Sequence, residues 1–215
     1  SSDLFVRWGD AALEAAIGAG AHYLDSTGEG TFIRRVFEEF GPRAEAAGCG
    51  LLTAMGYDWV PGNLAGGLAL RDAGPEARRV ELGYFMTGIT SAGGMSGGTR
   101  ASAAGEVLEP GYTFRDGRIV TERGAKRLKS FDIGGGRTAP GISVGSSEQF
   151  ALPRLQRELW DVDTYLGWFG PASRPLQVFS AGAEVLMKVP GVRAGLSAAA
   201  GRLVKGSTGG PDAEA

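Results

Sequence analysis

The sequence predicts the α/β fold class, with a parallel sheet followed by a mixed α+β region. In residues 1–75, short strand-like runs alternate with segments whose apolar residues recur at helical spacing. Strands that alternate with helices are joined by right-handed crossovers and therefore lie parallel. From Arg78 onward the strand candidates become longer, with helices interleaved among them, and this change predicts the mixed second region.

The first region is expected to contain three helices and two strands. Asp10 can cap the first helix, which ends at Gly18. Pro42 is expected to interrupt or kink the second helix, because proline lacks an N–H and its ring crowds the preceding turn. Pro61 suits the start of the third helix, which stops at Gly74. In chain order the predicted elements are helix 10–18, strand 22–25, helix 31–48, strand 51–54 and helix 61–74.

The second region is expected to form a sheet of its own. Its apolar runs predict strands at 80–89, 117–121, 128–133, 142–144 and 159–165, with helices at 97–107 and 175–188. The boundary between the regions gives predicted domains at 1–75 and 76–190. Residues 191–215 are expected to form a C-terminal helix or tail, with the last ten disordered because they are polar and poor in apolar residues.

Charge and composition exclude several classes of function. The chain has 215 residues, a net charge of −2 and a pI near 5.6, so it lacks the basic field that nucleic-acid binding requires. It contains no apolar run long enough to span a membrane, and we expect a cytoplasmic protein. The only cysteine, Cys49, and the only histidine, His22, lie far apart in the sequence, so we expect neither a disulfide nor a metal site.

Two short motifs match the sequence patterns of known functional sites, but the residues around them do not support those functions. Residues 134–139 are a permissive match to the dinucleotide-binding pattern G-x-G-x-x-G, with Ala139 in place of the last glycine. Pro140 follows where a helix should begin, so we interpret them as a flexible turn. The nucleophile pattern G-x-S-x-G occurs at 94–98 and 141–145. A serine hydrolase of the α/β type needs a histidine after the serine, and His22 lies upstream of both, so this class is a less favoured alternative.

Three segments contain more residues that could bind a ligand or take part in catalysis than their surroundings do. Residues 22–29 and 56–63 each join a predicted strand to a predicted helix. In an open α/β sheet, ligands bind at the carboxyl ends of the strands, so polar side chains in both segments are expected to face one crevice. Residues 96–99 form the sequence Ser-Gly-Gly-Thr at a predicted helix start, where exposed amides hold anions or polar substrate groups.

Each segment also has a purely structural interpretation. Ser26 and Thr27 can cap the following helix, with Glu29 in its first turn. Asp58 can be an ordinary helix cap, and the glycines of 96–99 can allow close packing of a helix on the sheet. The residues alone leave both interpretations open.

Together the three segments, in this order, resemble the saccharopine dehydrogenase-like oxidoreductases. The resemblance includes the branch of trans-acting enoyl reductases, and it rests on His22–Glu29, Gly56–Pro61 and Ser96–Thr99 within residues 4–190. It implies an NAD(P)-binding Rossmann-like domain, of which residues 1–75 would be the C-terminal remnant, followed by an α+β substrate and dimerisation domain at 76–190.

The resemblance also implies that the chain is truncated at its N-terminus. The glycine-rich cofactor loop and the first four strands of the family are expected upstream of Ser1. We therefore expect weak or no NAD(P) binding by these residues, and no catalysis by them alone. The strand at 23–25 would become an edge with unpaired backbone groups, so we also expect the isolated chain to aggregate.

By the resemblance, the parent protein transfers hydride between NAD(P)H and a small carbonyl, imine or enoyl substrate. The expected catalytic residues are Asp25, Tyr57 and Asp58; the cofactor-binding residues are Ser26, Thr27, Gly28 and Glu29; and the substrate-binding residues are Gly56, Ser96, Gly97, Gly98 and Thr99. Homodimerisation is a further expectation. The alternative is a non-catalytic interaction or dimerisation module, which, unlike an enzyme, need not bind NADPH.

Overall fold

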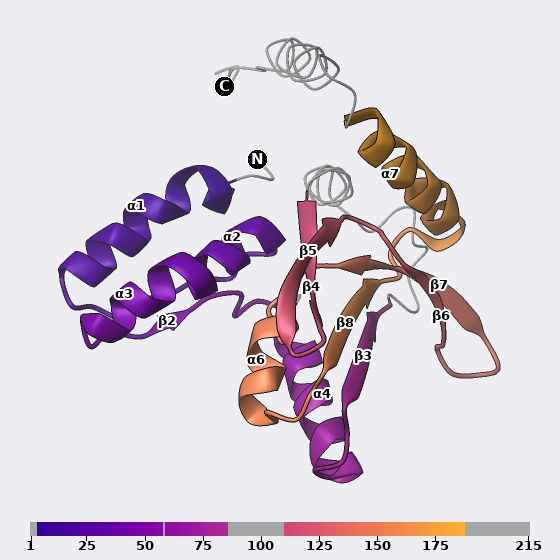
Figure 1. Ribbon diagram of the computed structural model, residues 1–215, viewed down its shortest axis with the longest axis horizontal. Helices are drawn as coiled ribbons and strands as arrows, with labels where there is room; N and C mark the ends of the chain where they lie inside the picture. The colour runs from indigo at the N-terminus through magenta and orange to yellow at the C-terminus, as the bar shows by residue number, and fades with distance from the viewer. Residues whose placement is uncertain (1–3, 58, 86–109, 188–215) are drawn as a thin grey trace, which may run out of the picture. The chain divides into compact units, whose positions relative to one another are not determined.

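The computed structural model describes residues 4–57, 59–85 and 110–187 (Figure 1). Ser1–Ser180 form one compact unit and Ala181–Ala215 form a second, so helix α7 (Ser173–Met187) belongs in part to each. Both sheets lie within the first unit. These are a two-stranded parallel sheet and a six-stranded mixed sheet, as the sequence predicts for an α/β protein with a following α+β region.

The first part of this unit alternates helices with two short parallel strands. Its elements are α1 (Leu4–Gly18), β1 (Tyr23–Leu24), α2 (Gly30–Arg35), the π-helix η1 (Val36–Phe40), α3 (Gly41–Ala46) and β2 (Leu51–Leu52). β1 and β2 pair in parallel, with Tyr23 opposite Leu51. The helices are held together by a core of Leu13, Phe32, Val36 and Phe40. The predicted alternation of helices with parallel strands is confirmed.

Helix α1 begins earlier than the sequence suggests, so the expected cap at Asp10 is wrong. Asp10 lies inside the helix, where its Oδ2 accepts a hydrogen bond from Arg35 Nη1 at 2.9 Å. Glu29 caps the N-terminus instead: its Oε1 accepts from the amide of Phe5 at 3.2 Å and its Oε2 from the amide of Val6 at 2.7 Å. A carboxylate near free helix amides is favourable, and this one arrives from a distant segment that no local motif marks.

The expected interruption at Pro42 takes the form of a widened helical turn. Residues Gly30–Ala46 run as α2, η1 and α3 without a break, and the π-helical turn ends at Phe40, two residues before the proline. The amide of Gly41 bonds to the carbonyl of Val36, one residue further back than in an α-helix. The proline therefore changes the winding of the helix but does not end it.

The second part of the unit forms the six-stranded sheet and its helices. The elements are α4 (Val60–Ala73), β3 (Arg79–Tyr84), β4 (Pro110–Arg115), β5 (Arg118–Arg123), β6 (Leu128–Asp132), β7 (Thr138–Val144), α6 (Glu148–Leu155), β8 (Asp161–Leu166), the 3-10 helix η2 (Gly170–Ala172) and α7. The strand order is β5-β4-β8-β7-β6, and β3 pairs in parallel with β8. The other described pairs of this sheet are antiparallel.

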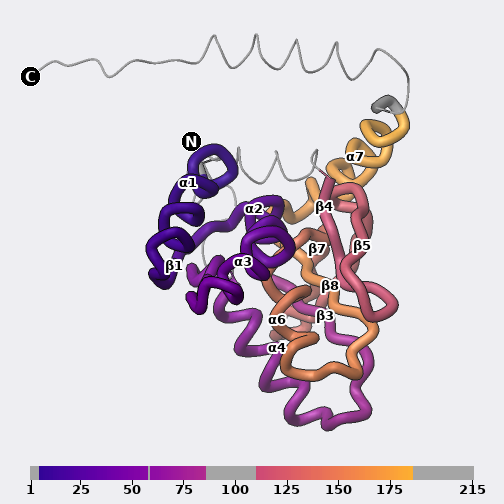
Figure 2. Tube along the Cα trace, turned by 60° about the vertical axis from the view of Figure 1, so that its left-hand side comes forward, coloured from indigo at the N-terminus to yellow at the C-terminus, as the bar shows by residue number. Residues whose placement is uncertain are grey.

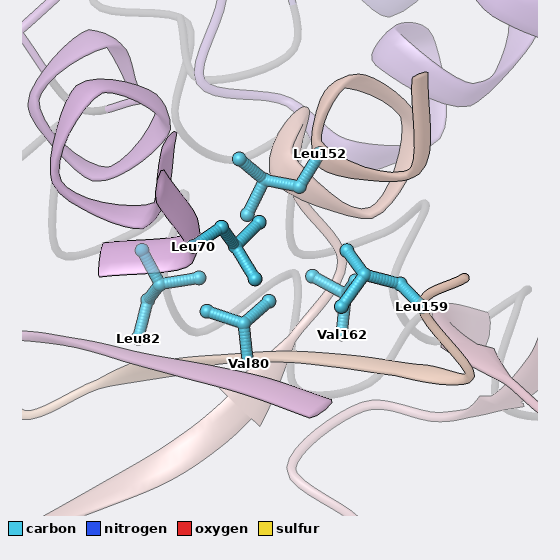
Figure 3. Packing of buried hydrophobic residues seen from close by; sticks show 6 residues of the cluster. All are labelled: Leu70, Val80, Leu82, Leu152, Leu159 and Val162. Atoms are coloured by element: carbon cyan, nitrogen blue, oxygen red, sulfur yellow. The ribbon is translucent and has the colours of Figure 1, made fainter. Parts of the chain in front are cut away.

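Helices α4 and α6 cover one face of the larger sheet. They lie side by side next to β3 and β8 (Figure 2). Figure 3 shows the core between these elements, to which the helices, both strands and the turn before β8 contribute Leu70, Val80, Leu82, Leu152, Leu159 and Val162. Burying such side chains contributes about 1.5–3 kcal/mol each. This core fixes the position of α4, whose first turn enters the candidate site described below.

The opposite face of the larger sheet carries paired charges. Side chains alternate between the two faces along a strand, so Asp161 and Asp163 point away from the core that contains Val162. Arg115 binds both aspartates, at 2.7 and 2.8 Å, and Arg127 binds Asp163 at 2.9 Å. These charges neutralise one another, with Arg115 on the neighbouring strand β4 and Arg127 just before β6.

One strand of the larger sheet and one helix that covers it are absent from the sequence prediction. Strand β4 begins with Pro110 and Gly111, which read as turn residues. Helix α6 contains Pro153, and its hydrophobic periodicity is weak. The predicted helix at 97–107, the end of the predicted strand 80–89 and the predicted C-terminal tail lie outside the described residues. The predicted domain boundaries at 75 and 190 stay predictions.

Candidate functional site

Asp25 joins the carboxyl ends of the two parallel strands. Its amide donates to the carbonyl of Leu52 at 3.0 Å, and its carbonyl accepts from the amide of Met55 at 2.8 Å. Its carboxylate Oδ1 accepts from the amides of Thr27 and Ala54, both at 2.9 Å, and from the hydroxyl of Thr53 at 3.1 Å. Asp25 is 8% exposed. The carboxylate therefore holds the turns after β1 and β2 in one arrangement.

The structure brings the first two predicted segments together, as expected for the ends of neighbouring parallel strands. A Cβ placed on Gly56 would lie 3.1 Å from the carbonyl oxygen of Ser26, a tight contact, so glycine at residue 56 favours the close approach of the two turns. Ser26 is exposed and Tyr57 is 90% exposed. Buried Ala54, at the same junction, has a φ of 62°, a strained conformation of the kind that clusters at functional sites.

Thr27 and Glu29 have clear structural roles. Thr27 is 1% exposed, and its Oγ1 accepts from the amide of Glu29 at 3.0 Å, which closes the turn before α2. The carboxylate of Glu29 caps α1. Cofactor binding by Ser26, Thr27, Gly28 and Glu29 stays a prediction, as do catalytic roles for Asp25 and Tyr57 and a substrate contact at Gly56. Asp58 and the four substrate-binding residues Ser96, Gly97, Gly98 and Thr99 lie outside the described residues.

A second polar cluster, which the sequence prediction missed, surrounds the first turn of α4. Tyr84 of β3 donates its hydroxyl proton to Glu148 Oε1 of α6, and a weaker hydrogen bond of 3.3 Å joins the same hydroxyl to the carbonyl of Trp59. Asn63 donates from Nδ2 to the carbonyl of Trp59 at 2.9 Å and to Ser147 Oγ at 2.8 Å. Three elements distant in sequence thus converge on one point.

Glu148 is fully buried at the start of α6. Burial raises the pKa of this carboxyl, and polar groups around it, Ser146 and Tyr84 among them, oppose the rise. The helix start itself is fixed by Gln149, whose Oε1 accepts from the amide and the hydroxyl of Ser146, both at 2.7 Å. The spacing Ser-x-x-Gln is a capping signal that could have revealed this helix from the sequence.

Three buried polar atoms of this cluster have no hydrogen-bond partner within the described part of the chain. They are Glu148 Oε2, Asn63 Oδ1 and Trp59 Nε1. Such an atom costs about 1–3 kcal/mol when it stays unsatisfied, so its presence in a native structure needs an explanation. Unsatisfied buried groups around a carboxyl with a raised pKa are typical of functional sites.

The cluster and the strand-end turns are directly connected. Helix α4 begins just after Gly56, whose carbonyl accepts from the amide of Val60 at 3.2 Å. Trp59 precedes this amide and packs edge-on against Tyr84, with ring centroids 5.5 Å apart. The turn at Gly56 thus touches Ser26 on one side and leads into the Tyr84–Glu148 cluster on the other.

The described residues supply no cradle for a dinucleotide. Gly134, Gly135 and Gly136 have φ values of 84°, 62° and 69° and form the turn between β6 and β7, where the amide of Ile133 bonds to the carbonyl of Arg137 at 2.9 Å. A strand follows this glycine run, and the pyrophosphate of a nucleotide needs a helix N-terminus there. Ser143, from the second G-x-S-x-G match, lies within β7 rather than at a strand-to-helix turn.

Searches for other kinds of site cover the same described residues. None of their His, Cys, Asp and Glu side chains form a group of three or more that could hold a metal ion. None of the helices in the described ranges is long and apolar enough to cross a membrane.

The sequence of this α/β chain is distantly similar to two proteins described as enoyl reductases. No family model matches the chain. Two curated relatives, each described as a "putative trans-acting enoyl reductase", come from the H37Rv and CDC 1551 strains of Mycobacterium tuberculosis. Each is 29% identical over 211 residues, a match that covers 89% of this chain and 49% of the relative. The chain thus spans about half the length of the curated relatives it matches.

Proposed function

We propose that the chain is part of a nicotinamide-dependent oxidoreductase of the saccharopine dehydrogenase-like, enoyl reductase-like type. In this proposal the whole protein reduces an enoyl, carbonyl or imine substrate with hydride from NADH or NADPH. The observation that carries the proposal is the junction at the ends of β1 and β2, where Asp25 ties together two turns with exposed Ser26 and Tyr57. The similarity to two enoyl reductase-like relatives supports it.

The described residues fit the substrate side of such a site better than the cofactor side. They offer the strand-end turns and a buried acid that contacts a tyrosine hydroxyl, Glu148 with Tyr84. They offer no G-x-G-x-x-G turn between a strand and a helix, so we propose that pyrophosphate binding depends on residues outside the described ranges. When bound, the nicotinamide would supply the hydride, and the residues of this chain would orient the substrate.

The test is a titration of the 215-residue chain with NADPH, followed by nucleotide fluorescence. We expect weak binding or none, and no oxidation of NADPH when an enoyl thioester is added. A longer protein that contains this chain and an upstream glycine-rich strand–helix unit is expected to bind NADPH and to reduce the thioester. Tight NADPH binding by the 215 residues would contradict the proposal that nucleotide binding depends on other residues. A longer protein without reductase activity would contradict the proposed function.

A further inference from the structure

An open groove of about 360 Å³ lies between helix α4 and strand β3. Its helical wall consists of small residues, among them Gly62, Ala65 and Ala69, and its other wall is strand β3 from Val80 to Tyr84. The charged residue among the described lining is Glu81, and Lys129 pairs with its carboxylate. The groove is therefore largely apolar, which suits a hydrocarbon chain better than a sugar or a nucleotide.

The groove meets the buried polar cluster at one end. Gly62 and Tyr84 belong to both, since they line the groove and form part of the contact with Glu148. A Cβ on Gly62 would lie 1.9 Å from the Tyr84 hydroxyl and 2.4 Å from Glu148 Oε1. Because residue 62 has no side chain, the Tyr84 hydroxyl lies against α4 at this end of the groove, with the buried carboxyl of Glu148 behind it. The groove thus has an apolar length and a hydrogen-bonding end.

We propose that this groove binds the acyl group of the substrate, with its hydrocarbon chain along α4 and β3 and its carbonyl oxygen hydrogen-bonded by the Tyr84 hydroxyl. Glu148 is the positioning residue that orients this hydroxyl. The assignment deepens the proposed function, on which the naming of an acyl substrate rests.

The contact between Tyr84 and Glu148 can supply the hydrogen-bond donor that this assignment needs. Tyr84 has one hydroxyl proton, which points to Glu148 Oε1. For Tyr84 to donate to the carbonyl oxygen of the ligand, its own hydroxyl oxygen must accept a hydrogen bond from the carboxyl of Glu148. A chain of hydrogen bonds then runs from Glu148 through Tyr84 to the ligand. A neutral Glu148 can supply that donor, and burial favours the neutral form by raising the pKa of the carboxyl.

The experiment is calorimetric binding of a dodecanoyl thioester of N-acetylcysteamine to the 215-residue chain, without any nucleotide. The control ligand is the matching dodecyl thioether, which lacks the carbonyl oxygen. Ala65→Leu and Ala69→Leu fill the groove from exposed helical positions, and Ala73→Leu makes the same change on α4 at an exposed position that does not line the groove. We expect both groove variants to weaken thioester binding by about tenfold or more, and the Ala73 variant to bind as the parent chain does.

Tyr84→Phe separates the hydrogen bond from the groove. We expect it to weaken thioester binding by about threefold to tenfold, with little effect on the thioether. Tyr165→Phe, which changes a tyrosine of the adjacent strand β8, is the matched control. Urea unfolding of each variant shows whether it is folded.

Three results would overturn the assignment: no thioester binding by the folded parent chain, parent-like binding by both groove variants, or equal binding of thioester and thioether that Tyr84→Phe leaves unchanged. Because no nucleotide is present, failure here is distinguishable from failure of the proposed reductase function. A longer protein that reduces enoyl thioesters while its groove variants keep the parent KM would leave the function intact and refute the groove.

Discussion

Substitution of Gly62 by alanine is the sharpest test of the Tyr84–Glu148 contact. The new Cβ would lie 1.9 Å from the Tyr84 hydroxyl and 2.4 Å from Glu148 Oε1, closer than any real Cβ contact. The tyrosine cannot move freely, because Trp59 packs edge-on against its ring. The hydrogen bond must therefore break, and a fully buried carboxyl is left without its donor.

The magnitude follows from three opposing effects. Overpacking costs about 1–3 kcal/mol, and an unsatisfied buried group costs about 1–3 kcal/mol more. Alanine in a helix gains about 0.5–1 kcal/mol over glycine. We therefore expect Gly62→Ala to lower the free energy of unfolding by about 1–5 kcal/mol, measured by urea denaturation.

Gly67→Ala on the same helix is the matched control. A Cβ there meets Leu155 Cδ1 at 3.5 Å, an ordinary contact, so the helix gain remains and we expect stabilisation by about 0.5–1 kcal/mol. If the Gly62 variant proves as stable as the Gly67 variant, the close contact of α4 with Tyr84 and Glu148 is not present in the protein.

Three further predictions concern buried or capping carboxyls. The raised pKa of Glu148 means that the folded state holds the carboxyl proton more tightly than the unfolded chain does, so the stability that this proton contributes is lost as pH rises from about 4.5 through the folded-state pKa. Glu148→Gln is therefore expected to be more stable than the parent chain at neutral pH but not below about pH 4.5. Parallel profiles of unfolding free energy against pH for the two chains would contradict this. Glu29→Ala is expected to lower the free energy of unfolding by about 0.5–2 kcal/mol and to speed amide hydrogen exchange at the start of α1. Glu45→Ala, at an exposed helical position, is the control, and unchanged exchange in the Glu29 variant would contradict the cap. Asp25→Ala is expected to lower the free energy of unfolding by about 2–4 kcal/mol, measured by urea denaturation. Asp25→Asn is expected to lower it less, because asparagine keeps one acceptor oxygen. Equal losses would show that the hydrogen bonds to Oδ1 do not hold the two turns together.

Periodicity and turn chemistry were sufficient to predict the first sheet. Strands β1 and β2 lie where apolar runs separate helical segments, and their ends meet as the parallel topology requires. The meeting of Ser26 with Gly56 could be expected from this topology alone. In contrast, the cap on α1 could not, because Glu29 is far from that helix in sequence.

The second cluster was missed because its chemistry depends on tertiary contacts. Tyr84 reads as an ordinary strand residue and Glu148 lies where the sequence predicts neither a helix nor a strand, and only packing of β3 and α6 against α4 joins them. Strand β4 was missed because Pro110 suggests a turn, although proline is tolerated at the first residue of a strand. Local sequence patterns contain no information on the contact between Tyr84 and Glu148.

The widened turn at Val36–Phe40 has a consequence for how this chain can tolerate insertions and deletions. Because the hydrogen bond from the amide of Gly41 to the carbonyl of Val36 spans one residue more than an α-helical bond, the widened turn takes up one extra residue within the helix. Removing one residue there would restore regular α-helical winding with little rotation of the residues that follow. Ala44, which is 2% exposed, would then stay in the protein interior, so homologous chains that keep this packing are expected to tolerate the loss of one residue at this turn.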